Sequence, residues 1–147
     1  MRPFAVLLLL ALPAPALAAE LRDCDQAEIG IASVSPGPGN TNIRHFYEGR
    51  VTMLLLDREE PACCAFGVAF LLPSGDGREE PAFVQCQAVI GFAGLDVAGA
   101  HSAYDPARGL TLTIPAREYV PDTGGSREIA PLVVTIDMGA GTIRIGE

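Results

Sequence analysis

The strongest constraint on the fold of this chain is a two-residue alternation of apolar side chains that recurs along the sequence. Residues 110–114 alternate leucine or isoleucine with threonine, and residues 62–72 carry a bulky face and a mostly small one. A period of two places successive side chains on opposite faces of a β-strand. The 16 glycines and 12 prolines interrupt these segments, and no stretch shows the period of an amphipathic helix. We therefore predict an all-β domain, most simply a two-sheet antiparallel β-sandwich and otherwise a small β-barrel.

The expected strands and turns follow from the same pattern. Residues 91–103, rich in glycine and alanine, carry no clear assignment. Turns are expected at 73–77, 104–109 and 120–126, where proline, glycine and aspartate gather. The expected strands are 27–34, a long strand over 43–55, then 62–72, 82–90, 110–114 and a C-terminal hairpin.

The C-terminal hairpin can be placed in register by matching its faces. A two-residue turn at Gly139-Ala140, with glycine first as a type II′ turn prefers, sets Ile136 opposite Ile143. The same register sets Val134 opposite Ile145, and it places Thr135 and Asp137 opposite Arg144 and Thr142 on the solvent side. A loop one residue longer would bring apolar side chains against polar ones. The sequence therefore predicts the shorter turn.

The N-terminus has the features of a cleavable export signal. Arg2 supplies a positive start, residues 5–12 are apolar, and Pro13 and Pro15 end that run. Residues 16–18 then read Ala-Leu-Ala, the small-x-small pattern that signal peptidase accepts. The run is too short to span a bilayer, and no other run is long enough to do so. We expect a signal peptide at 1–18 and one exported domain at 19–147, in a periplasm or outside the cell.

Four cysteines in an exported chain predict two disulfides that stabilise the fold. If the turn at 73–77 is the whole loop, Cys64 lies directly opposite Cys86. We therefore expect a Cys64–Cys86 bridge and a Cys24–Cys63 bridge, although the three possible pairings stay open. A pairing of the neighbours Cys63 and Cys64 is the least expected, because it requires a strained ring. Zinc ligation is not expected, since the spacing lacks the paired Cys-x-x-Cys pattern.

The charge balance narrows the class of partner. The chain has 18 acidic and 10 basic residues, for a net charge of −8. Removal of residues 1–18 takes away Arg2 alone and leaves a net charge of −9. Such a surface argues against binding to nucleic acid or to anionic membranes. Every basic residue is arginine, which is typical of a GC-rich bacterial genome.

Few residues could carry chemistry. His45 and His101 are the only histidines, and Asp122 begins the tripeptide Asp-Thr-Gly that aspartic proteases carry. That chemistry needs a second carboxylate, which a homodimer could supply here. We instead expect Asp122 to form an ordinary Asx-type turn. His45 is expected to be partly buried with its nitrogen hydrogen-bonded. Met53 and Met138 fall on core faces, so a copper site is poorly supported, and we expect no metal or cofactor.

These observations favour a non-enzymatic function. We expect an exported β-sandwich domain that acts as a protein-binding or accessory module, with another exported protein as its partner. An inhibitor of a basic enzyme is one form that such a module could take. The alternative is a small-molecule-binding or hydrolytic site in the mouth of a sandwich or barrel. The sequence fixes neither the oligomeric state nor the roles of His45, His101 and Asp122.

The export signal gives a first testable prediction. When the full chain is produced in a Gram-negative bacterium, we expect the protein recovered from the periplasm to begin at Ala19. Intact-mass measurement and N-terminal sequencing check the cleavage site. Recovery of the uncleaved chain from the cytosol, with its cysteines reduced, would contradict both the signal and the predicted bridges.

Overall fold

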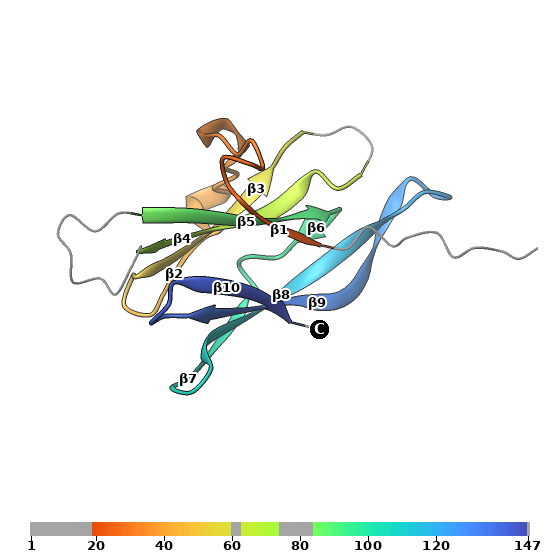
Figure 1. Cartoon of the computed structure of the whole chain (residues 1–147). Helices are drawn as coiled ribbons and strands as arrows, with labels where there is room; N and C mark the ends of the chain where they lie inside the picture. The colour runs from red at the N-terminus through yellow and green to blue at the C-terminus, as the bar shows by residue number, and fades with distance from the viewer. Residues whose placement is uncertain (1–18, 60–62, 74–83, 147) are drawn as a thin grey trace, which may run out of the picture.

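Two antiparallel sheets of five strands each form a β-sandwich (Figure 1). The computed structural model describes residues 19–59, 63–73 and 84–146. Strand β7 pairs with β8 beside β6, so that β6 and β7 share one edge of the second sheet. The predicted sandwich is therefore confirmed. Among the described residues, no helix has the length and apolarity to cross a bilayer.

Strands β2 to β5 and β7 to β10 follow up-and-down connections, whereas β1 and β2 lie at opposite edges of the first sheet. The first sheet has the order β1 (Glu20–Asp23), β5 (Val84–Phe92), β4 (Phe66–Pro73), β3 (Val51–Asp57) and β2 (Ile43–Phe46). The second sheet has the order β10 (Thr142–Gly146), β9 (Gly125–Asp137) and β8 (Gly109–Val120), followed by β6 (Gly94–Leu95) and β7 (His101–Asp105). Two short 3-10 turns, η1 (Ile31–Ser33) and η2 (Pro38–Asn40), precede β2. The chain passes from one sheet to the other between β5 and β6.

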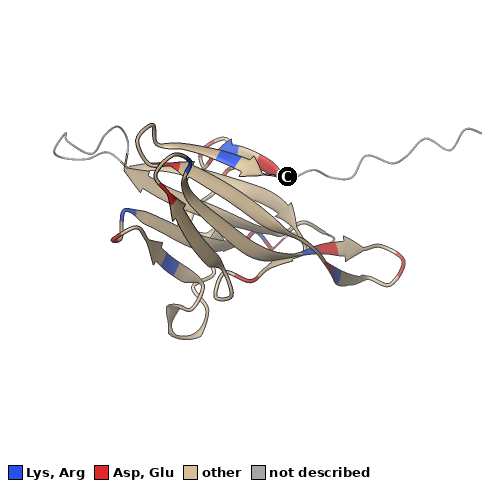
Figure 2. Cartoon of the chain, turned by 90° about the horizontal axis from the view of Figure 1, so that it is seen from below, with Lys and Arg blue, Asp and Glu red and all other residues tan. Residues whose placement is uncertain are grey.

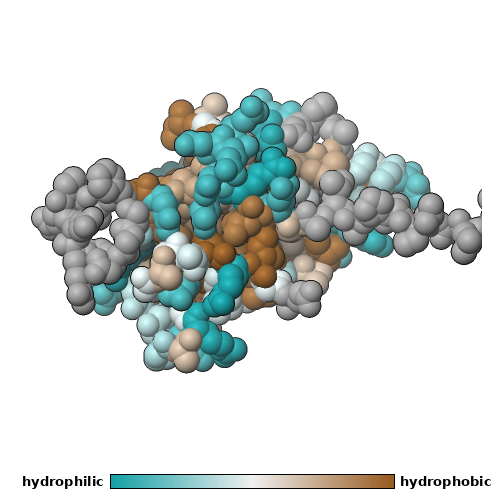
Figure 3. Space-filling view, viewed as in Figure 1, coloured by the Kyte–Doolittle hydropathy of each residue, from teal (hydrophilic) through white to brown (hydrophobic). Residues whose placement is uncertain are grey.

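Alternate side chains of the two sheets pack against each other in one main core. On β4, Val68, Phe70 and Leu72 are buried, as the expected bulky face requires. Alternate residues of β8 and β9 meet them from the second sheet, and Leu112, Ile114, Val134 and Ile136 are fully buried. On the side of β1 and β10, apolar surface is visible between the two sheets (Figure 3).

The outer face of the first sheet is covered by the N-terminal segment. A second apolar cluster there contains Cys24, Leu56, Ala69 and Ala88, with Ile29 and Val34 packed against it. Because the chain from Cys24 to Val34 covers this face, the expected strand at 27–34 is wrong. The first strand is β1, and residues 27–34 form turns and η1.

The expected long strand at 43–55 is also wrong, since it is a hairpin of β2 and β3. Phe46 pairs with Val51, and the chain reverses between them. Tyr47, Glu48 and Gly49 all have positive φ angles, of 51°, 57° and 83°. Non-glycine residues seldom adopt this conformation, so the local sequence gave no sign of the turn.

The C-terminal hairpin has the predicted register but a different turn. Ile136 lies opposite Ile143 and Val134 opposite Ile145. The positive φ falls at Gly141, at 64°, and not at Gly139 as a type II′ turn requires. Asp137 closes the turn, because its Oδ1 accepts hydrogen bonds from the backbone N–H groups of Gly139 and Ala140 at 2.9 and 3.0 Å. These bonds hold the pKa of Asp137 below its ordinary value.

The turn between β7 and β8 forms as predicted. Asp105 Oδ1 accepts a hydrogen bond from Ala107 N at 2.8 Å, and Gly109 ends the turn with a φ of 98°. A Cβ atom at position 109 would lie 2.1 Å from the carbonyl oxygen of Ile136. Only glycine fits there, because the adjacent strand β9 approaches so closely.

The predicted disulfide pairing is wrong. The structure joins Cys24 to Cys86, with a Cα–Cα distance of 5.4 Å, and Cys63 to its neighbour Cys64. The expected pairing assumed a loop at 73–77, most of which lies outside the described residues. The ladder instead pairs Pro73 with Val84, so Leu71 and not Cys64 lies opposite Cys86. The Cys24–Cys86 bridge spans 62 residues, and the chain-entropy model gives such a bridge about 4 kcal/mol of stabilisation.

The main core gives a prediction on stability. Phe70 is fully buried between the sheets, so we expect Phe70→Ala to lower the free energy of unfolding by about 3–5 kcal/mol. Ile31→Ala is the control, because Ile31 is 89% exposed, and its change should stay within about 0.5 kcal/mol. Urea unfolding followed by circular dichroism measures both. Equal losses in the two variants would contradict the assigned core.

Candidate functional site

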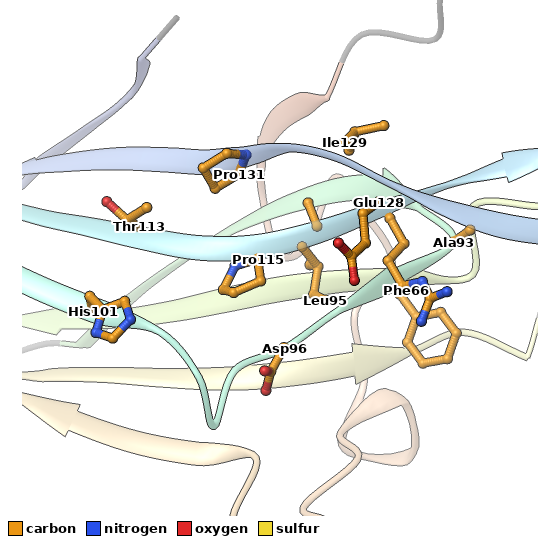
Figure 4. Close-up of a pocket in the computed structure, with 13 residues that line it drawn as sticks. Phe66, Ala93, Leu95, Asp96, His101, Thr113, Pro115, Glu128, Ile129 and Pro131 are labelled. Atoms are coloured by element: carbon orange, nitrogen blue, oxygen red, sulfur yellow. The ribbon is translucent and has the colours of Figure 1, made fainter.

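An open groove of about 700 Å³ lies beside β6, β8 and β9. Its walls come from Phe66 at the start of β4, from residues 93–96 around the β5–β6 crossing, and from the second sheet. His101 lies at one end and Phe66 at the other, with Pro115 and Leu95 between them (Figure 4). The remaining lining residues are Ala93, Gly94, Asp96, Thr113, Ala116, Arg117, Glu128, Ile129 and Pro131.

Two prolines explain why the sheet is irregular at this position. Ile114 pairs with Leu132 and Ala116 with Ile129, so Pro115 on β8 lies opposite two residues of β9, one of which is Pro131. This is a β-bulge, and proline is tolerated in a strand at such a point because it has no N–H to donate. The bulge coincides with the gap between β6 and β7 along β8.

The segment from Asp96 to Ala100 connects two residues that line the groove, Asp96 and His101, and Arg44 holds it in place. From β2 in the first sheet, Arg44 Nη1 donates to the carbonyl oxygens of Val97, Ala98 and Ala100 at 3.3, 2.7 and 3.3 Å. Asp96 Oδ1 accepts a hydrogen bond from Gly99 N at 2.9 Å. Hydrogen bonds from a charged donor are the stronger kind. Arg44 thus ties the first sheet to the edge of the groove.

The charged groups of the groove are two carboxylates and one guanidinium. Arg117 and Glu128 lie opposite each other in the β8–β9 ladder, and Asp96 lies on the segment beyond Leu95 (Figure 4). The ion pairs found in the described ranges lie elsewhere, and one of them, Arg127 with Glu118, is on the projecting part of the same hairpin (Figure 2). Neither Asp96 nor Glu128 has an ion-pair partner in the described part of the chain.

A second, smaller hollow of about 320 Å³ adjoins the groove. The two share Phe66 and Ala93, so together they form one continuous surface from His101 toward the tip of the β8–β9 hairpin. Tyr119 stands on one side of the hollow. Its other lining residues are Cys63, Cys64, Ala65, Gly124, Gly125 and Ser126.

The candidate residues chosen from the sequence lie on three separate elements. His45 is exposed on β2, with its Nδ1 3.0 Å from Thr52 Oγ1, so the expected partial burial is wrong. His101 is exposed on β7, where it pairs in register with Thr113 and lines the groove. Asp122 is exposed in the turn between β8 and β9. No hydrogen bond or ion pair in the described segments joins any two of these three.

The Asp-Thr-Gly tripeptide forms the tip of the β8–β9 hairpin. Thr123 N and Gly124 N both donate to the carbonyl oxygen of Val120, at 3.2 and 3.0 Å. Thr123 Oγ1 accepts a hydrogen bond from Gly125 N at 3.3 Å, so threonine and not Asp122 supplies the side-chain bond of this turn. The turn was predicted, but its Asx type was not correct. Within the residues placed by the structure, no three His, Cys, Asp or Glu side chains form a metal-binding group.

Sequence reasoning missed the groove, although one signal for it was present. Asp96 lies in residues 91–103, for which the apolar pattern predicts no element, and no sequence motif marks Glu128. The two prolines, Pro115 and Pro131, each fall within an apolar strand segment. A proline in each of two neighbouring strands marks an interruption of the ladder, but the sequence alone does not show that the two strands pair at that point.

The role of Arg44 gives a prediction. Since Arg44 holds three carbonyl groups, we expect Arg44→Ala to lower the free energy of unfolding by about 1.5–3 kcal/mol and to speed amide exchange at Gly99 and Ala100. Arg108→Ala is the control, because its ion pair with Asp105 is exposed, and its cost should be below about 1 kcal/mol. Hydrogen-exchange mass spectrometry and urea unfolding measure these effects. Unchanged exchange in the 96–100 segment would contradict the role given to Arg44.

Comparison with known proteins assigns no family to this chain. No protein-family model matches the sequence, and no curated protein or solved structure matches it either. A functional assignment therefore depends on the features of the groove: an apolar wall and two carboxylates that have no ion-pair partner among the described residues.

Proposed function

We propose that this chain is an exported, non-enzymatic binding module that holds a positively charged, extended segment of another exported protein in its groove. The observation that carries this proposal is the position of Asp96 and Glu128. Both carboxylates line a groove whose other walls are largely apolar, and neither has an ion-pair partner in the described residues. A basic side chain of a partner would supply the missing counter-charge.

The charge of the whole chain supports a basic partner. A net charge of −8 attracts cationic proteins over distances up to the Debye length and raises the rate of encounter. Arg117 lies beside Glu128 and offsets part of the local charge. The groove therefore favours a segment that alternates basic and apolar residues over one that is basic throughout.

The shape of the surface supports an extended polypeptide rather than a compact small molecule. The groove and the second hollow share Phe66 and Ala93, so an extended occupant would run from His101 past Phe66 toward Tyr119. Beyond β6, no described strand pairs with the outer edge of β8 from Glu118 to Val120. An extended peptide can add main-chain hydrogen bonds at a free strand edge and place alternate side chains in adjoining pockets.

The placement of the ionisable side chains in the groove supports a binding function rather than a catalytic one. A hydrolytic site needs a nucleophile and a base within hydrogen-bond reach, with a third group that orients the base. His101 and Thr113 are neighbours in register, but no side-chain hydrogen bond joins them. The Cys24–Cys86 disulfide is compatible with an exported protein, as the signal at 1–18 predicts.

The test uses the mature protein and a short labelled peptide that alternates arginine and valine. We expect Glu128→Gln and Asp96→Asn each to weaken binding by about fivefold, because each removes one carboxylate from the groove. Asparagine at 96 keeps the oxygen that accepts the bond from Gly99. Asp25→Asn is the matched control, since it makes the same charge change on an exposed turn next to the first sheet.

Fluorescence anisotropy at low and at raised salt measures the affinity. Weakening by Asp25→Asn to the same extent as by the groove variants would show that only net charge matters. Equal binding of a peptide that alternates glutamate and valine would contradict the charge preference. If free arginine competes as well as the peptide does, the site is one for small molecules and the proposed partner is wrong.

A further inference from the structure

The two disulfides of this chain have different physical roles. Cys24–Cys86 joins residues 62 positions apart, at the end of β1 and in β5. Cys24 is 6% exposed and packs in the second apolar cluster, and its N–H donates to the carbonyl oxygen of Cys86. A bridge of this span restricts the unfolded chain strongly and so stabilises the fold.

The Cys63–Cys64 bridge restricts almost nothing in the unfolded chain. It joins adjacent residues, so it closes no loop of the polypeptide. The entropic stabilisation by a disulfide increases with the length of the loop that it closes. The fold therefore does not depend on this bridge.

The position of Cys63–Cys64 makes it accessible to other molecules. Both residues precede β4 and lie outside the hydrogen-bonded ladder, and both line the second hollow beside Tyr119 and Gly124. Both are partly exposed, whereas in the other bridge Cys24 is buried and only Cys86 is partly exposed. Exposure is a property of labile disulfides, while buried bridges resist reduction.

The backbone at Cys64 has a second unusual feature. Its φ angle is 66°, in the left-handed region that side chains other than glycine seldom adopt. Such conformations cluster at functional sites and persist only where the surroundings enforce them. Opening of the ring between neighbours removes one of the constraints that hold Cys64 in this conformation.

We propose that Cys63–Cys64 is a thiol–disulfide exchange site that accepts two electrons from the dithiol of another exported protein. A thiolate of the dithiol attacks the sulfur of one cysteine and forms a mixed disulfide. The Cys63–Cys64 bond breaks, and its electron pair goes to the other cysteine sulfur, which takes up a proton. The second thiol of the partner then attacks the mixed disulfide. This step oxidises the partner to a disulfide and leaves Cys63 and Cys64 as two thiols.

The experiment treats the mature protein with a limiting amount of a purified thioredoxin in its dithiol form. Iodoacetamide then traps free thiols, and peptide mass spectrometry locates them. We expect Cys63 and Cys64 to be alkylated at least about tenfold faster than Cys24 and Cys86. Alkylation of all four at the same rate, or of Cys24 and Cys86 first, would overturn the proposal. Alkylation of Cys63 and Cys64 without any reductant would do so as well.

Two controls complete the test. The variant with Cys63→Ser and Cys64→Ser should keep the unfolding midpoint of the parent protein and take up no electrons from the limiting dithiol. A large fall in its midpoint would instead assign this bridge a stabilising role. A parallel reaction replaces the thioredoxin by an equal concentration of thiol groups from glutathione. Faster reduction by glutathione would overturn the assignment of a protein dithiol as the electron donor.

Discussion

The structure depends on the contact between two apolar sheet faces, and the groove lies where that contact ends. Val68 and Phe70 of the first sheet meet Leu112 and Val134 of the second, and all four are fully buried. The outer face of the first sheet is covered by the chain around Cys24. The open surface with the most varied chemistry is thus left beside the crossing from β5 to β6, where both sheets contribute residues.

The groove exists because the second sheet is interrupted there. Pro115 lacks the N–H that a regular ladder would use, and a bulge in β9 lies opposite it. Arg44 contacts the segment between β6 and β7 through charge-assisted hydrogen bonds to main-chain carbonyls. The groove takes residues from both sheets, and most of its lining residues belong to strands.

The strand register could be predicted from the sequence where one face of a strand is apolar and the other polar. A turn could not be predicted where its residues do not favour turn conformations. The β9–β10 register could be predicted because a slip by one residue would set isoleucines against polar groups. The turn at Tyr47 and Glu48 could not, since neither residue favours a positive φ. The prediction of the β4–β5 register was wrong because the sequence does not mark where the loop between these strands ends. The error in the cysteine pairing followed from this register. The partner carboxylates of the groove come from segments 32 positions apart, Asp96 and Glu128, so no sequence pattern joins them.

The groove and the Cys63–Cys64 hollow are neighbours for a structural reason. Phe66 begins β4 two residues after Cys64, and Ala93 lies in the crossing between the sheets, and both residues line both depressions. The ladder between β4 and β5 shifts register at this same point, between Phe66 and Gly67. The other register shift, between Ile114 and Ala116, lies at Pro115 in the wall of the groove. Both shifts of the described ladders thus lie beside the groove.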